Sequence, residues 1–528
     1  MNALAGTGAL VRLALRLDRV RLTVWVLLIA AMPAGTAANY MQLYPTERSL
    51  QNVSGVISNP SLVAINGPLF DVSLGGLTAW KIGATSFILV GLMSLFTVIR
   101  HTRTEEETGR LELLGATVVG RHAPLTAAAL VAGAASLVIA VLVAATLIGV
   151  GLPSAGSVTL GLAIGLTGVA FTAIAAVCAQ LTTSARSATG IASAVLGAAY
   201  VLRAMGDVGP TWLSWLSPIG WAMRIQAYAG EQWWVAVLFV LLTVALGGTA
   251  YALTARRDIG FGLLPPRLGP ASAANWLRTP LALAWRLHRG VLVGWVIGLA
   301  VSGVAMDGAA VAVSGGFDAN EQLKELLARM GGSSGLTDAY LGAIFSIIGV
   351  VAAAYTVQAT QRMHAEETGG RVEPLLATSV GRVQWALSHF VFALLGTALV
   401  LTVAGVGAGL AYGLQIDDVG GQVARLLGAA LVQLPAAWVL AGLGMALFGL
   451  APRFATLTWA GLIVCVVLLE LGALLGLSQW VVDISPFAHV PKLPGSQFTG
   501  TPLLWLTAIA ATFSVAGLAG FRRRDIAG

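Results

Sequence analysis

The chain has 528 residues, of which 57% are hydrophobic and only 10% charged, and its formal net charge is +7. Soluble domains carry about 25% charged residues, so this composition excludes an ordinary soluble protein. The charges sit in short breaks between apolar runs, which argues against a basic patch for nucleic acid. We therefore expect an all-α integral membrane protein whose main solvent is the lipid bilayer.

Twelve apolar runs are long enough to cross a bilayer, which takes about 20 residues in a helix. They cover residues 22–40, 77–99, 124–150, 156–180, 187–206, 233–254, 290–310, 340–359, 384–413, 425–450, 455–478 and 502–521. The runs do not alternate as the strands of a membrane barrel do, so we predict helices. The first run follows an arginine-rich segment and resembles a signal peptide. We interpret it as an uncleaved span because a similar segment recurs inside the chain.

The distribution of basic residues predicts an orientation. With the N-terminus inside, 22 of the 30 lysine and arginine residues fall on the inner side, which is where such residues concentrate. Arginine far outnumbers lysine, a bias typical of GC-rich bacterial genomes. We therefore predict a multi-pass protein of the bacterial plasma membrane with both termini in the cytoplasm.

A repeat relates the two halves of the chain. Residues 106–121 read EETGRLELLGATVVGR and residues 366–382 read EETGGRVEPLLATSVGR. Aligned by identity, with one extra glycine in the second copy, Glu106 matches Glu366. Two flanking anchors also recur: Arg16-Leu17 matches Arg286-Leu287, and Arg256-Arg257-Asp258-Ile259 matches Arg523-Arg524-Asp525-Ile526. We predict two tandem, parallel six-helix halves, 1–259 and 285–528, joined by a cytoplasmic linker at 260–284.

Each repeated motif lies in the predicted cytoplasmic loop between the second and third spans of its half. It combines acidic residues, a glycine and a short amphipathic stretch. One interpretation is a solvated hairpin, in which the charges only keep the loop in water. The other is a short helix that docks in a groove of a soluble partner. Two nearly identical copies at equivalent positions favour docking.

The motif and its duplication resemble the permeases of type-2 ABC exporters, and in particular the twelve-span actinobacterial permeases of tetronasin-type antibiotic and multidrug exporters. The resemblance implies export of hydrophobic antibiotics or drugs, powered by a separate ATP-binding subunit. The presence of two motifs favours two copies of that subunit. The resemblance also implies that the motifs couple the permease to that ATPase. The coupling residues would be Glu106, Glu107, Gly109, Arg110 and Glu112 in the first half, and Glu366, Glu367, Gly369, Arg371 and Glu373 in the second.

The sequence itself also points to a separate ATPase. A P-loop needs a Gly-Lys pair, and the three lysines follow Trp80, Leu323 and Pro491. The chain is therefore not expected to be an enzyme, and ATP and magnesium would bind to the partner. We find no pattern typical of a metal site, a nucleophile–base pair or a nucleotide-binding loop.

Glu470 is the one acidic residue placed well inside a predicted span. A carboxyl group inside a membrane suggests a substrate or proton pathway. An alternative function is therefore a proton-coupled secondary drug transporter that uses Glu470. A third interpretation is that Glu470 is a packing feature near the outer end of its span.

Overall fold

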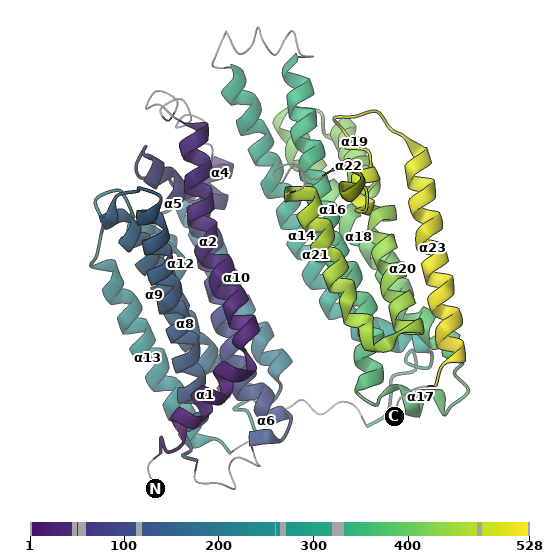
Figure 1. Ribbon diagram of the computed structural model, residues 1–528, viewed down its shortest axis with the longest axis horizontal. Helices are drawn as coiled ribbons and strands as arrows, with labels where there is room; N and C mark the ends of the chain where they lie inside the picture. The colour runs from purple at the N-terminus through teal and green to yellow at the C-terminus, as the bar shows by residue number, and fades with distance from the viewer. Residues whose placement is uncertain are drawn as a thin grey trace. The chain divides into compact units, whose positions relative to one another are not determined.

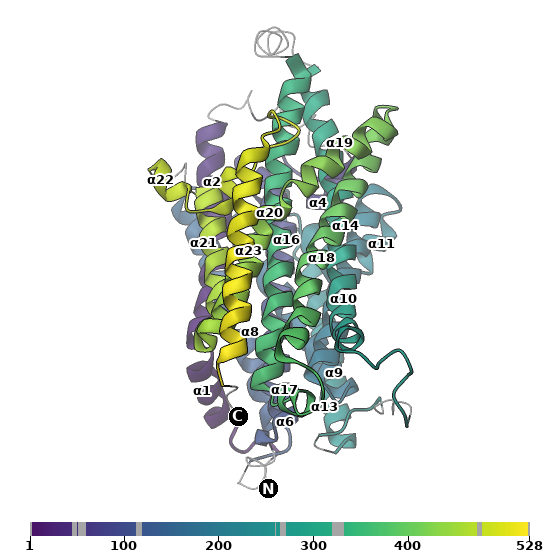
Figure 2. The same ribbon diagram turned by 90° about the vertical axis from the view of Figure 1, so that its right-hand side faces the viewer.

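The computed structural model describes residues 3–44, 50, 60–111, 119–258, 260–264, 271–318, 332–471 and 478–525. Within these residues every regular element is a helix. The chain divides into two compact units, residues 1–269 and 270–528, each built mainly of long helices that run side by side (Figures 1 and 2). The helix that opens the second unit begins at Pro280, inside the segment predicted as the linker.

The first unit contains six long helices and several short ones. Its elements are α1 (Thr7–Leu17), α2 (Arg19–Leu43), α4 (Pro60–Asn66), α5 (Leu74–Ile99), the π-helical turn η1 (Arg100–Thr104), α6 (Glu105–Glu107), α8 (Ala123–Gly149), α9 (Ser154–Leu181), α10 (Ala185–Val208), α11 (Trp212–Trp215), α12 (Pro218–Arg224) and α13 (Val235–Arg256). The N-terminus lies at the same end of this unit as α6 (Figure 1).

The second unit repeats this plan with longer opening helices. Its elements are α14 (Pro280–Asp318), α16 (Gly332–Thr368), α17 (Val372–Leu376), α18 (Arg382–Gln415), α19 (Val419–Leu431), α20 (Leu434–Leu450), the 3-10 turn η2 (Pro452–Leu457), α21 (Thr458–Leu471), α22 (Gln479–Val482), the 3-10 turn η3 (Pro486–His489) and α23 (Gly500–Arg523). The C-terminus lies at the same end of this unit as α17 (Figure 1).

Eleven segments within the described residues are helical, long and apolar enough to cross a membrane. They account for every predicted span except 290–310, which lies within α14. The predicted span 425–450 falls on α19 and α20, which are separated at Val432 and Gln433. Pro435 at the start of α20 explains the interruption, because proline has no amide hydrogen to continue a helix. The all-α membrane fold is confirmed.

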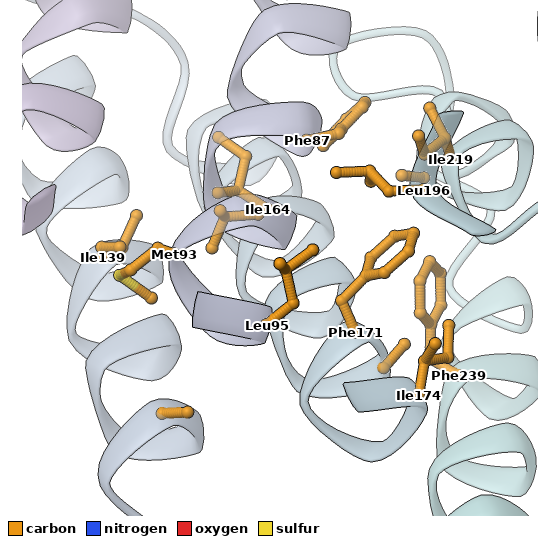
Figure 3. Packing of buried hydrophobic residues seen from close by; sticks show 14 of the residues in the cluster. Phe87, Met93, Leu95, Ile139, Ile164, Phe171, Ile174, Leu196, Ile219 and Phe239 are labelled. Carbon is orange, nitrogen blue, oxygen red and sulfur yellow. The ribbon is translucent and has the colours of Figure 1, made fainter. Parts of the chain in front are cut away.

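Each motif extends from one of the most buried helices of its unit. In the most apolar stretches of α5, α9 and α16, 72%, 78% and 72% of the residues are buried, against 17% for α13. Figure 3 shows how side chains of neighbouring helices fill the core of the first unit, with Phe87, Phe171, Leu196 and Phe239 close together. Each motif is therefore attached to a helix held on most sides by its own unit.

Small residues bring helices together in the second unit, as is common in membrane proteins. A Cβ added at Gly449 of α20 would collide with the carbonyl oxygen of Gly517 in α23. The two helices lie side by side in both views (Figures 1 and 2). This backbone contact ties α23, the last helix of the chain, to the interior of its unit.

Candidate functional site

The two motifs begin with similar helical ends and a tight turn. In the first unit α5 continues through η1 and α6 to a turn at Gly109, whose φ is 72°. In the second unit α16 continues to Thr368, a turn follows at Gly370 with φ of 65°, and α17 begins at Val372. A positive φ favours glycine, which has no Cβ to clash with the backbone. Glu112 lies outside the described residues.

Glu106 belongs to a buried ionic cluster in the first unit. Its side chain is 6% exposed, and Arg257 donates to both of its carboxylate oxygens, over 2.6 Å to Oε1 and 2.9 Å to Oε2. Arg103 Nη1 donates to Oε2 over 2.7 Å. Two guanidinium groups therefore neutralise and orient this carboxylate, the arrangement that a buried charge needs.

This cluster joins the ends of three helices. Arg103, fully buried in η1, also donates through Nε to the carbonyl of Ala179 in α9 over 2.9 Å. Arg257, which follows α13, donates through Nε to Gln180 Oε1 over 2.6 Å. The first motif is therefore fixed to α9 and to the end of α13.

Glu367 makes the corresponding contact in the second unit. Its carboxylate is 6% exposed, and Arg524 Nη1 and Nη2 donate to Oε1 and Oε2, each over 2.6 Å. Arg524 immediately follows α23, as Arg257 follows α13. Its guanidinium also lies 5.1 Å from the ring centres of both Phe448 and Phe521, a cation–π arrangement.

Glu366 forms a second, local cluster. Arg362 Nη2 lies 2.7 Å from its Oε1, and Arg371 Nε donates to its Oε2 over 2.6 Å. The hydrogen bond from Arg371 to Glu366 raises the pKa of this guanidinium above its usual value. In the first unit Arg110 and Glu105 make the matching pair, over 3.5 Å.

These contacts correct the predicted correspondence between the motifs. The sequence alignment pairs Glu106 with Glu366, but the arginine partners pair Glu106 with Glu367 and Glu105 with Glu366. The left-handed turns likewise pair Gly109 with Gly370 rather than with Gly369. When Gly109 is matched with Gly370, both copies have the same number of residues from this glycine to the Gly-Arg pair that ends the motif. No extra glycine then has to be placed in the second copy.

The π-helical turn η1 gives the first unit one extra residue just before its motif. A π turn holds one more residue than an α turn, and η1 lies in the first unit only among the described residues. Upstream of it, the hydroxyl pair of Ser94 and Ser136 corresponds to that of Thr356 and Thr397. The stretch from Ser94 to Glu106 is therefore one residue longer than the stretch from Thr356 to Glu367. The extra residue lies in η1.

The remaining predicted residues lie nearer the surface. Arg110, Gly369, Arg371 and Glu373 are exposed, while Gly109 is partly buried at its turn. Glu107 is exposed too, but its Oε2 accepts from the amide of Ala185 at the start of α10, over 2.9 Å. Glu470 lies in α21, and its side chain is outside the described part of the chain.

Sequence reasoning missed Arg103 of the ionic cluster and the role of Arg257 and Arg524. The repeated Arg-Arg-Asp-Ile segments were the available signal, because they recur at equal places in the two halves. In the sequence they indicate only flanking anchors of the repeat. Their second arginines instead hold the motif carboxylates.

Comparison with known proteins identifies the family. Residues 277–522 match the family model described as "Multidrug efflux system permease Rv1217c, C-terminal domain". The chain is 44% identical over 529 aligned residues to the multidrug efflux system permease protein Rv1217c of Mycobacterium tuberculosis (strain ATCC 25618 / H37Rv). The alignment covers 99% of this chain and 96% of that relative. The chain therefore belongs to the family of multidrug efflux system permeases.

Proposed function

We propose that this chain is the membrane permease of an ATP-driven exporter that moves hydrophobic antibiotics or drugs out of a bacterial cell. Family membership supports a permease, and the name of the relative, a multidrug efflux system permease protein, supports the substrate class. The absence of any Gly-Lys pair from the sequence supports a separate ATPase that binds ATP and magnesium.

The observation that carries the coupling role is the pair of buried carboxylate–arginine contacts. Glu106 with Arg257, and Glu367 with Arg524, hold the start of each motif at the same place in its unit. A solvated hairpin needs no such buried ionic anchor, which is costly to desolvate. Two fixed loops suit two copies of an ATP-binding subunit, one at each motif on the cytoplasmic side.

The exposed and the buried members of the motifs then have different roles. Arg110, Arg371 and Glu373 are exposed and are the candidates for direct contact with the ATPase. The side chains of Glu106, Glu366 and Glu367 are buried and would position the loops from within. The motifs would therefore contact the ATPase through their exposed residues, and not through every acidic residue that they contain.

Co-expression with an ATP-binding protein encoded beside the gene tests the proposal. The two should purify together, and the complex in proteoliposomes should hydrolyse ATP in a vanadate-sensitive, drug-stimulated manner. Transport that needs no ATPase and collapses with the proton gradient would contradict it. That outcome would instead favour a proton-coupled transporter, with Glu470 as the first residue to test.

A further inference from the structure

Arg257 and Arg524 each hold both ends of their motif. The side chain of Arg524 binds the carboxylate of Glu367 before the loop, and its backbone carbonyl accepts from Arg382 Nη1 after the loop, over 2.6 Å. In the first unit the carbonyl of Arg257 accepts from Arg121 Nη2, also over 2.6 Å. One residue thus brackets the whole loop in each unit.

In both units one arginine holds the start of the loop through its guanidinium and the end of the loop through its backbone carbonyl. We call this arrangement the bracket, and it recurs although its surroundings differ. Arg257 shares its carboxylate with Arg103 and also contacts Gln180. Arg524 lies against Phe448 and Phe521 instead. The guanidinium–carboxylate pair and the arginine–carbonyl bond are the features that both units keep.

Each bracket is stiff and well shielded. The Arg257 and Arg524 side chains are 8% and 15% exposed, and each makes two nearly parallel hydrogen bonds to a carboxylate. Such bidentate pairs fix direction as well as distance, and partial burial protects them from screening by salt. A displacement of either loop therefore has to move Arg257, which follows α13, or Arg524, which follows α23.

The second unit offers a continuous path from this residue into the core. Arg524 follows directly on α23, and Gly517 of α23 lies in backbone contact with Gly449 of α20. Phe448, beside Gly449, packs against the Arg524 guanidinium. A pull on Arg524 is thus transmitted to two helices that cannot easily slide apart.

We propose that Arg257 and Arg524 are positioning residues that transmit the movement of each loop to the last helix of its unit. This inference rests on the proposed function, because it requires that an ATPase moves the loops. An arginine that only caps a helix end would stabilise the unit without affecting the link between ATP hydrolysis and transport. Transport per ATP hydrolysed is therefore the decisive readout.

The second unit gives the cleaner test, since Glu367 has Arg524 as its guanidinium partner whereas Glu106 has two. In the complex with its ATPase, Arg524→Gln should still purify with the ATPase. Drug stimulation of hydrolysis and transport per ATP should fall by about tenfold, within the usual range of coupling between sites. The exchanged pair Glu367→Arg with Arg524→Glu should recover a large part of the loss.

Arg523→Gln is the matched control, because Arg523 is an exposed neighbour on the same turn. The Arg523→Gln variant should transport as much drug per ATP hydrolysed as the wild type. If Arg524→Gln does not fold, Arg524→Lys carries the test, because it keeps the charge and loses the two-point contact. Reduced coupling in the folded lysine variant is then expected.

Wild-type coupling in folded Arg524→Gln or Arg524→Lys would overturn the inference and leave the proposed function intact. A folded exchanged pair that couples no better than Arg524→Gln would also overturn it. Failure of the wild-type chain to bind an ATPase would instead overturn the proposed function, and the inference with it.

Discussion

Asp18 Oδ2 and His101 Nε2 lie 2.8 Å apart, and Asp18 Oδ1 lies 3.0 Å from Arg100 Nε. Asp18 separates α1 from α2, so its carboxylate ties this break to η1, which directly follows α5. By the match of Arg16-Leu17 with Arg286-Leu287, the equivalent residue is His288, whose Nε2 lies 3.1 Å from His389 Nδ1. There α14 continues without a break, so the two units differ close to their motifs.

Asp18→Asn should destabilise the first unit. The Asp18 side chain is 1% exposed, and the amide cannot balance the charge of Arg100 or accept through both of its polar atoms. We expect a loss of about 1–3 kcal/mol, typical of a buried polar group left without its partner. Thermal unfolding in detergent, followed by tryptophan fluorescence, measures it. Asp258→Asn at an exposed position is the control, and equal midpoints would refute the expectation.

Gly370→Ala should destabilise the second motif more than Gly369→Ala. Gly370 has φ of 65°, where an added Cβ costs about 1–2 kcal/mol. The nearest atoms to an alanine Cβ at Gly369 belong to the guanidinium of Arg371, at the end of a flexible side chain. Gly109→Ala should behave like Gly370→Ala because its φ is 72°. Unfolding midpoints of the three variants give the order, and a larger loss at Gly369 would restore the alignment by sequence identity.

Gly449→Ala should loosen the contact between α20 and α23. The added Cβ would collide with the backbone of Gly517, which cannot rotate away as a side chain can. We expect a loss of about 1–3 kcal/mol, as for other overpacked contacts. Gly428→Ala in α19, where the Cβ meets open space, is the control. The midpoint of thermal unfolding distinguishes them, and a Gly449→Ala protein as stable as Gly428→Ala would show that the helices adapt.

Glu373→Lys and Glu367→Lys should fail in different ways. Glu373 is exposed on α17, so its reversal should weaken binding of the ATPase and leave the unfolding midpoint unchanged. Glu367 is buried against Arg524, and its reversal should cost about 3–5 kcal/mol, because it leaves like charges in contact. Co-purification and thermal unfolding separate the two effects. A normal complex with Glu373→Lys would remove Glu373 from the docking surface.

Much of the fold could be predicted because lipid imposes simple rules. A run such as 384–413 has to be a helix, since a membrane offers its backbone no other hydrogen-bond partners. Periodicity and length do not show where a long helix breaks or extends, so the interruption at Val432 and Gln433 and the full length of α14 were not predicted. Those features depend on local backbone geometry and on packing within each unit.

The sequence alone determined that this protein spans the membrane through many helices, that it carries one motif twice, and that it lacks the Gly-Lys of a P-loop. Only the tertiary structure decided which motif carboxylates correspond. Identity placed Glu106 on Glu366, whereas Arg257 and Arg524 select Glu106 and Glu367. The physical reason is that an ion pair forms between groups that folding brings together. Residues 105–109 read EEETG and residues 366–370 read EETGG, so matching the same letters shifts the alignment one position away from the residues that make the same contacts.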